Sequence, residues 1–146
     1  MKKRSAANST PKPPSSPTFF LDACLGKNQI ATALRGAGEQ VQVHDDHFPQ
    51  GTHDEIWLSA VGKRGWIVLT KDDRIRYHIA AINAIKSAGA TAIILPKGSL
   101  KASEMAEIFI KVLPNIKTFI EKHKPPFIAR LTPGGALAVI DIKGKR

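Results

Sequence analysis

The expected architecture follows from one segment, Trp66-Ile67-Val68-Leu69-Thr70-Lys71-Asp72-Asp73. Its first four residues are all apolar, which is typical of a strand that is covered on both faces of a sheet. Shorter runs of the same kind occur at 18–22 and 91–95. Strands of this type, when separated by helices, predict a parallel sheet with helices packed on both of its faces.

Helical periodicity fills the segments between these strands. Apolar residues follow helical spacing from Ile30 to Ala37, and further helices are predicted over roughly 53–63, 73–87 and 100–123. Ile56 and Ile79 are assigned to the buried faces of the second and third of these helices, and a break is expected at Pro114. Residues 39–44 alternate like a half-exposed strand, and 127–131 and 136–142 flank a Pro-Gly-Gly turn. We therefore expect an α/β, Rossmann-like, mostly parallel sheet with a C-terminal β-hairpin at one edge.

The basic charge is concentrated at the two ends of the chain. Lys and Arg number 22 against 12 Asp and Glu, a formal net charge of +10. Residues 1–17 contain basic residues, many prolines and serines and no acid, which predicts a disordered arm, and 143–146 form a basic tail. The domain is expected to span 18–142. The basic ends fit a nucleic-acid-binding role and a merely solubilising role equally well.

Several classes of protein are excluded by what the sequence lacks. No apolar run approaches the roughly 20 residues that cross a bilayer, so no membrane association is expected. The basic start is followed by polar residues rather than by the apolar stretch of a signal peptide, which predicts a cytoplasmic protein. The single cysteine, Cys24, excludes an internal disulfide framework.

Carboxylates lie where such a sheet binds its ligands. Open α/β sheets bind ligands beyond the carboxyl ends of their strands. Asp22 ends the first strand, Asp72 and Asp73 follow a later one, and Asp54 begins a helix on the same side. Like charges about 5 Å apart repel by roughly 3 kcal/mol at an effective dielectric constant near 20. Mg²⁺ or Mn²⁺ would relieve this repulsion, and such an ion can activate water toward a phosphodiester.

Asp22 is hard to explain structurally, because no helix starts at it, but other residues of the set also have a structural interpretation. Thr52-His53-Asp54-Glu55 fits a capping box, and the similar shape of Thr70-Lys71-Asp72-Asp73 makes Asp73 a candidate helix cap. The His- and Asp-rich loop at 44–53 leaves a zinc site open as a minor alternative. Lys71, Arg74 and Arg76 are candidates for binding a substrate phosphate, with surface ion pairing as the alternative.

The segments 19–22, 33–38, 54–57 and 67–76 together resemble the PIN-like ribonuclease superfamily, most closely its VapC-type toxin branch. The resemblance implies a Mg²⁺- or Mn²⁺-dependent endoribonuclease that cleaves RNA and is held inactive by a cognate antitoxin. The catalytic and metal-binding acids of that family fall on Asp22, Asp54 and Asp72, with Asp73 as a supporting metal ligand.

Two other functions remain open alongside a ribonuclease. One is a catalytically inactive module of the same fold that binds nucleic acid or protein. A less favoured one is a metal-dependent phosphatase or DNA nuclease. The amphipathic stretch at 100–123 and the terminal hairpin fit a homodimer face, an antitoxin groove or simple core packing equally well.

Overall fold

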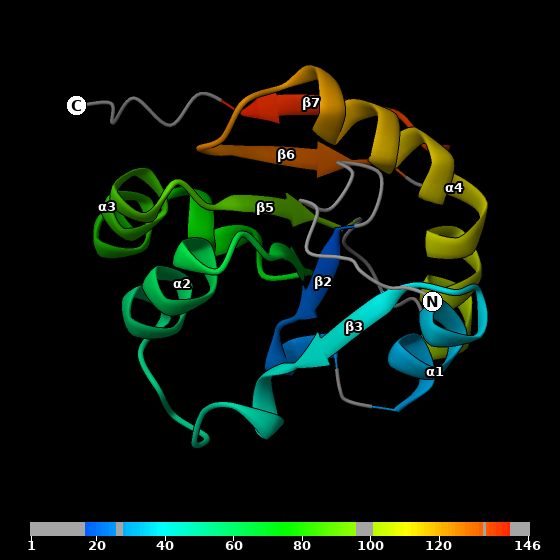
Figure 1. Ribbon diagram of the computed structural model, residues 1–146, viewed down its shortest axis with the longest axis horizontal. Coiled ribbons are helices and arrows are strands. Elements are labelled where there is room, and N and C mark those ends of the chain that lie inside the picture. The colour runs from blue at the N-terminus through cyan, green and yellow to red at the C-terminus, as the bar shows by residue number, and fades with distance from the viewer. Residues whose placement is uncertain (1–16, 26–27, 96–100, 133, 141–146) are drawn as a thin grey trace, which may run out of the picture.

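The computed structural model describes residues 17–25, 28–95, 101–132 and 134–140. Within these residues six strands form one sheet in the order β3-β2-β4-β5-β6-β7 (Figure 1). The first five are parallel, and β7 pairs antiparallel with β6 at the edge. The strands are β2 (Thr18–Leu21), β3 (Gln40–Val43), β4 (Ile67–Thr70), β5 (Thr91–Ile94), β6 (Phe127–Leu131) and β7 (Leu137–Ile140). The predicted α/β class, the mostly parallel sheet and the terminal hairpin are thus confirmed.

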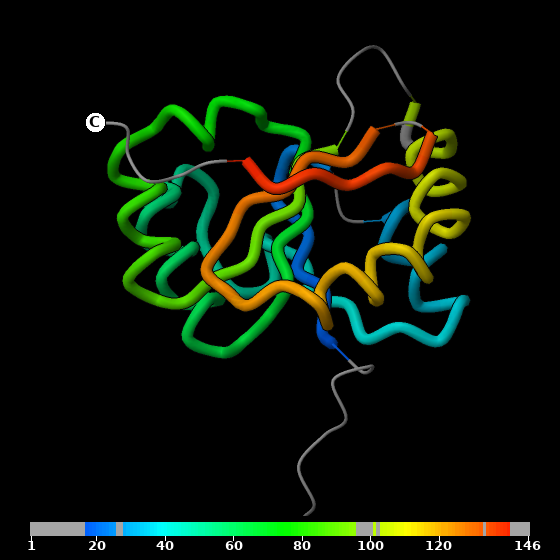
Figure 2. Tube along the Cα trace, turned by 90° about the horizontal axis from the view of Figure 1, so that it is seen from above, coloured from blue at the N-terminus to red at the C-terminus, as the bar shows by residue number. Residues whose placement is uncertain are grey.

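Four helices within the described ranges cover the sheet on both faces, as predicted. They are α1 (Gln29–Gly36), α2 (Asp54–Lys63), α3 (Ile79–Ala88) and α4 (Ala102–Lys122). Helices α1 and α4 lie on one face and α2 and α3 on the other, an arrangement that is visible in both orientations (Figures 1 and 2). None of the described helices combines the length and apolar character needed to span a membrane.

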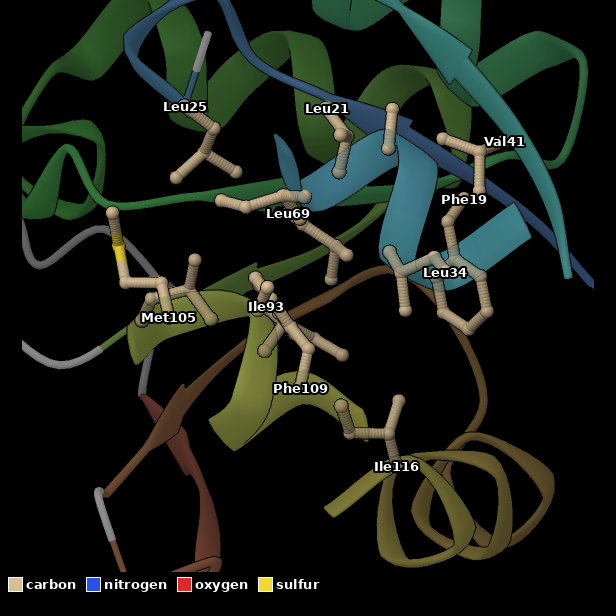
Figure 3. Close-up of a cluster of buried hydrophobic side chains, with 14 of the residues drawn as sticks. Phe19, Leu21, Leu25, Leu34, Val41, Leu69, Ile93, Met105, Phe109 and Ile116 are labelled. Carbon is tan, nitrogen blue, oxygen red and sulfur yellow. The ribbon is translucent and has the colours of Figure 1, made fainter. Parts of the chain in front are cut away.

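The central strands are apolar on both faces because successive side chains point into two different cores, one on each face of the sheet. Phe19 and Leu21 of β2 point toward α1 and α4, where they join Leu69 of β4 (Figure 3). Phe20 and Val68 point the other way, toward α2 and α3. Burial of each such side chain contributes about 1.5–3 kcal/mol, so both faces of the sheet support the fold.

One predicted helix break and one predicted helix start are wrong. Helix α4 runs unbroken through Pro114, because Phe109 and Ile116 on either side of the proline remain packed in the core. The proline lies on the exposed side of the helix, away from the core. Helix α3 begins at Ile79 rather than near residue 73, since Asp73–Arg76 form a short 3-10 turn.

Two predicted core residues lie on the surface instead. Ile56 is 55% exposed and Ile79 is 64% exposed, each near the start of its helix. Some predictions fall outside the described residues. They concern the basic arm apart from Pro17, the basic tail, and the last two residues of the expected hairpin.

Candidate functional site

The candidate site lies where the strand order reverses. Strand β2 has β3 on one side and β4 on the other, so the chain switches direction across the sheet between β2 and β4. Asp22 follows β2, and Thr70 is the last residue of β4. The Asp22 amide donates to the Leu69 carbonyl at 3.0 Å, and Thr70 Oγ1 donates to Asp22 Oδ2 at 2.7 Å. These bonds fix the Asp22 carboxylate at the position where open sheets of this class bind ligands.

An open pocket of about 370 Å³ lies at this position. Residues after β2, after β3 and at the start of α2 surround it, although they are far apart in the sequence. They are Asp22, Ala23, Cys24, His44, Gln50, Gly51, Thr52, Asp54 and Trp57. The predicted convergence of acids at one edge is therefore seen for Asp22 and Asp54, which share this pocket.

Asp22 is a buried acid without a cationic partner. Its side chain is 9% exposed, and no described Lys or Arg forms an ion pair with it. Desolvation raises the pKa of Asp22, and repulsion from Asp54 raises it further, while hydrogen bonds from Thr70, the Ala23 amide and Cys24 act in the opposite direction. A carboxylate held in this way gains stability from a cation that enters the pocket.

Asp54 faces the same pocket from the first residue of α2. Trp57 Nε1 donates to Asp54 Oδ1 at 3.2 Å, and His78 Nδ1 lies 3.9 Å from Oδ2. The predicted capping box is wrong, because the helix is capped at His53 without a side-chain bond and Glu55 Oε1 is buried with no hydrogen-bond partner. Asp54 is about one-third exposed and stays accessible from the pocket.

Asp72 is held by an arginine instead of facing the pocket. It caps the turn at 73–76 by accepting from the Arg74 amide at 3.1 Å, and Arg74 Nε and Nη2 lie 3.0 and 3.3 Å from its two oxygens. Hydrogen bonding and charge from Arg74 lower the pKa of Asp72. The Arg74 side chain is nevertheless 88% exposed. Lys71 is exposed beside it.

Asp73 is buried between two arginines. Arg76 Nε lies 3.3 Å and Arg130 Nη2 lies 2.9 Å from Asp73 Oδ1. The prediction that Asp73 caps the turn is wrong, since Asp72 has that role. Sequence reasoning missed Arg130. A charged residue within the otherwise apolar strand Phe127–Leu131 was the available signal.

The described residues contain no group of three or more His, Cys, Asp and Glu side chains able to hold a metal ion. The loop at 44–53 therefore forms no zinc site in this part of the chain: His44 lines the pocket, while His47 Nε2 bonds Gln42 Oε1 at 2.8 Å. Asp22 and Asp54 remain as two carboxylates on an open pocket. Mg²⁺ suits such a pair, because it binds one or two carboxylates and keeps several waters.

The chain is similar in sequence to known proteins. A family model described as "PIN like domain" matches residues 17–97, the part of the chain that carries Asp22, Asp54, Asp72 and Asp73. A protein of Mycobacterium tuberculosis (strain ATCC 25618 / H37Rv), named "Putative ribonuclease VapC45", is 26% identical over 126 residues, which cover 84% of this chain and 91% of that protein. No solved structure gives a significant match.

Proposed function

Because the chain belongs to the PIN-like domain family, we propose that it is a Mg²⁺- or Mn²⁺-dependent endoribonuclease. The observation that supports this most is the buried Asp22 carboxylate, which forms an ion pair with no described Lys or Arg and lines the same pocket as Asp54. The name of the mycobacterial relative, "Putative ribonuclease VapC45", supports RNA as the substrate.

In this proposal Asp22 and Asp54 hold the metal ion. The ion would supply an activated water and would neutralise charge on the phosphodiester. Thr70 and Cys24 orient the Asp22 carboxylate, with Cys24 Sγ 3.5 Å from Asp22 Oδ2. Trp57 orients Asp54 from within the same helix. Both acids are thus held by neighbouring side chains of this chain.

The proposal keeps Asp72 as the third catalytic acid and metal ligand. Its present partner, Arg74, is exposed and can leave Asp72 for a substrate phosphate without unfolding any element. Lys71 and Arg76 are the other candidates for phosphate contact. Asp73 remains the supporting acid. Because it contacts Arg76 and Arg130, we assign it the role of positioning these two arginines in preference to the role of a direct metal ligand.

We further propose that the protein is the cytoplasmic toxin of a type II toxin–antitoxin system. The name of the relative, "Putative ribonuclease VapC45", supports this, because that protein matches 84% of the present chain. A cognate antitoxin is the expected partner, with a homodimer as a further possibility. Expression in a bacterial host should arrest growth, and Asp22→Asn should remove the arrest. Arrest that persists in this variant would contradict the toxin assignment.

RNA cleavage tests the enzymatic proposal directly. The purified full chain should cleave RNA with Mg²⁺ or Mn²⁺ and not with EDTA. Metal-assisted charge stabilisation amounts to several kcal/mol, so Asp22→Asn and Asp54→Asn should each slow cleavage by about 100-fold or more. Asp46→Asn is the matched control, because it removes the same charge from an exposed residue outside the pocket lining. Cleavage that survives EDTA, or that persists in both variants, would refute the proposal.

A catalytically inactive binding module of the same fold is the second candidate. The ion pairs that hold Asp72 and Asp73 favour it, because they leave only two carboxylates on the pocket. This candidate predicts salt-sensitive RNA or protein binding without metal-dependent turnover. Binding of RNA or protein without RNA cleavage in Mg²⁺, in Mn²⁺ and in EDTA would support the inactive binding module over the nuclease.

A further inference from the structure

An exposed aromatic side chain follows the turn at 73–76. Tyr77 is 66% exposed, the largest exposed fraction among the big apolar and aromatic side chains of the described residues. The next residue, His78, lies 3.9 Å from Asp54 of the pocket, and Asp73 at the start of the turn contacts Arg130 of β6. The turn that leads to Tyr77 therefore connects the pocket with the arginine on β6.

One arginine is packed against the Tyr77 ring. The guanidinium carbon of Arg76 lies 4.6 Å from the ring centroid, and Arg76 Nη2 also donates to the Tyr77 hydroxyl. Arg76 is itself held by Asp73. The ring is thus supported by a cation that Asp73 holds, while most of the Tyr77 surface is exposed.

Exposed arginine, histidine and apolar side chains lie on this turn, on β6 and at the starts of α2 and α3. Arg74 is 88%, His78 49% and Arg130 44% exposed. Ile79 at the start of α3 and Ile56 in the first turn of α2 are the next most exposed large apolar residues of the described chain. Flat rings combined with cations fit a ligand that carries both aromatic faces and negative charge. Unpaired nucleotides have both, and stacking on aromatic residues and arginines is how proteins bind them.

We propose that Tyr77, backed by Arg76, stacks on an unpaired base of the RNA that enters the Asp22 and Asp54 pocket. Arg74 and Arg130 contact the phosphates on either side of that base. The choice of RNA rests on the proposed function, which this inference deepens by assigning a base-stacking residue outside the residues that line the pocket. Duplex RNA cannot use the ring, because its bases are stacked and paired.

Binding measured in EDTA isolates this surface from catalysis. The full chain is titrated into a short, unstructured, fluorescently labelled RNA, and in parallel into the same strand paired in a duplex. Tyr77→Ala should weaken binding of the single strand by roughly fivefold or more, because stacking on an aromatic residue contributes that much per base. Tyr77→Phe keeps the ring and should bind as the wild type does. Ile110→Ala, which removes an exposed apolar side chain from α4, is the matched control.

The salt dependence tests the arginines in the same assay. Arg130→Gln should reduce the slope of log affinity against log salt by about one, since one phosphate contact is lost. Circular dichroism verifies that each variant is folded. Equal single-strand affinity for Tyr77→Ala and wild type would overturn the inference, and so would an equal loss on single strand and duplex.

The inference and the proposed function fail in different ways. Tyr77-dependent binding in EDTA without metal-dependent cleavage would support the stacking surface and refute the nuclease. Metal-dependent cleavage with binding that ignores Tyr77 would support the nuclease and refute the stacking surface.

Discussion

Thr70 joins the ends of the two strands between which the sheet order reverses, because its Oγ1 donates to Asp22 Oδ2 at 2.7 Å. The same oxygen accepts from the Asp72 amide at 3.0 Å and lies 3.4 Å from Cys24 Sγ. One buried hydroxyl therefore positions the Asp22 carboxylate and the start of the loop that carries Asp72. Its removal should affect both the charge and the placement of Asp22.

Thr70→Val should weaken metal binding and move its pH dependence upward. The Thr70 hydrogen bond stabilises the ionised form of Asp22, so its loss raises further a pKa that burial already raises. Mn²⁺ affinity should then begin to fall at a higher pH as the solution is acidified. Loss of a hydrogen bond to a charged group should also destabilise the fold by about 1–3 kcal/mol. Isothermal titration with Mn²⁺ at several pH values measures the first effect, and urea unfolding measures the second.

Thr70→Ser provides the control for this substitution. Serine keeps the hydroxyl and loses only a methyl group, so Mn²⁺ affinity and its pH profile should remain close to the wild type. Identical pH profiles for Thr70→Val and Thr70→Ser would show that the hydroxyl does not control the charge of Asp22.

Asp22→Asn should leave the melting temperature unchanged or higher at neutral pH in EDTA. Because the folded-state pKa of Asp22 is raised, the ionised carboxylate opposes folding. That penalty is absent below the unfolded pKa, grows as the pH rises and is complete above the folded pKa. Asparagine removes this penalty because it carries no charge. The difference in melting temperature between variant and wild type should therefore disappear at acidic pH, where Asp22 is protonated in both states. Mg²⁺ should stabilise the wild type by mass action but not the variant. A clearly lower melting temperature for Asp22→Asn at neutral pH would contradict the conclusion that the ionised Asp22 carboxylate opposes folding.

The fold was largely predictable because its strands follow a simple rule. Buried parallel strands such as 67–70 are apolar at every position, and helical spacing between them sets the layers. Burial near helix starts was not predictable in the same way. Ile56 and Ile79 fit the apolar spacing, yet both side chains are largely exposed.

The candidate site was predictable only in its position. Strand ends indicated Asp22, and the start of α2 indicated Asp54, because sheet topology brings these places together. Local spacing could not show that Asp72 is held by Arg74 two residues later. Nor could it show that Asp73 is held by Arg130, which is 57 residues away in the sequence. Such ion pairs depend on the direction in which each side chain points, and the spacing of residues in the sequence does not specify that direction.

Asp73→Asn should destabilise the protein by about 1–3 kcal/mol. The substitution removes the negative charge that pairs with both arginines and leaves the like charges of Arg76 and Arg130 near each other without a counter-charge. Arg130→Gln alone should cost less, because Arg76 still neutralises Asp73. Urea unfolding of the two single variants and of the double variant gives the coupling energy of the pair. Strictly additive effects would show that the Asp73–Arg130 contact contributes no stability.

Gly62→Ala should destabilise the fold by about 1–3 kcal/mol, although alanine favours helices. A Cβ at this position of α2 would lie 2.7 Å from the Ala88 Cβ and 2.8 Å from the Ala90 Cβ, so the packing of α2 against α3 would have to open. Gly36→Ala in α1 is the matched control, since nothing lies within 4 Å of its added Cβ and a gain of up to about 1 kcal/mol is expected. Thermal unfolding of both variants measures the difference. Equal stability of the two variants would mean that α2 can move away from α3 without a loss of stability. The contact between these helices would then not be what holds Asp54, the first residue of α2, at the pocket.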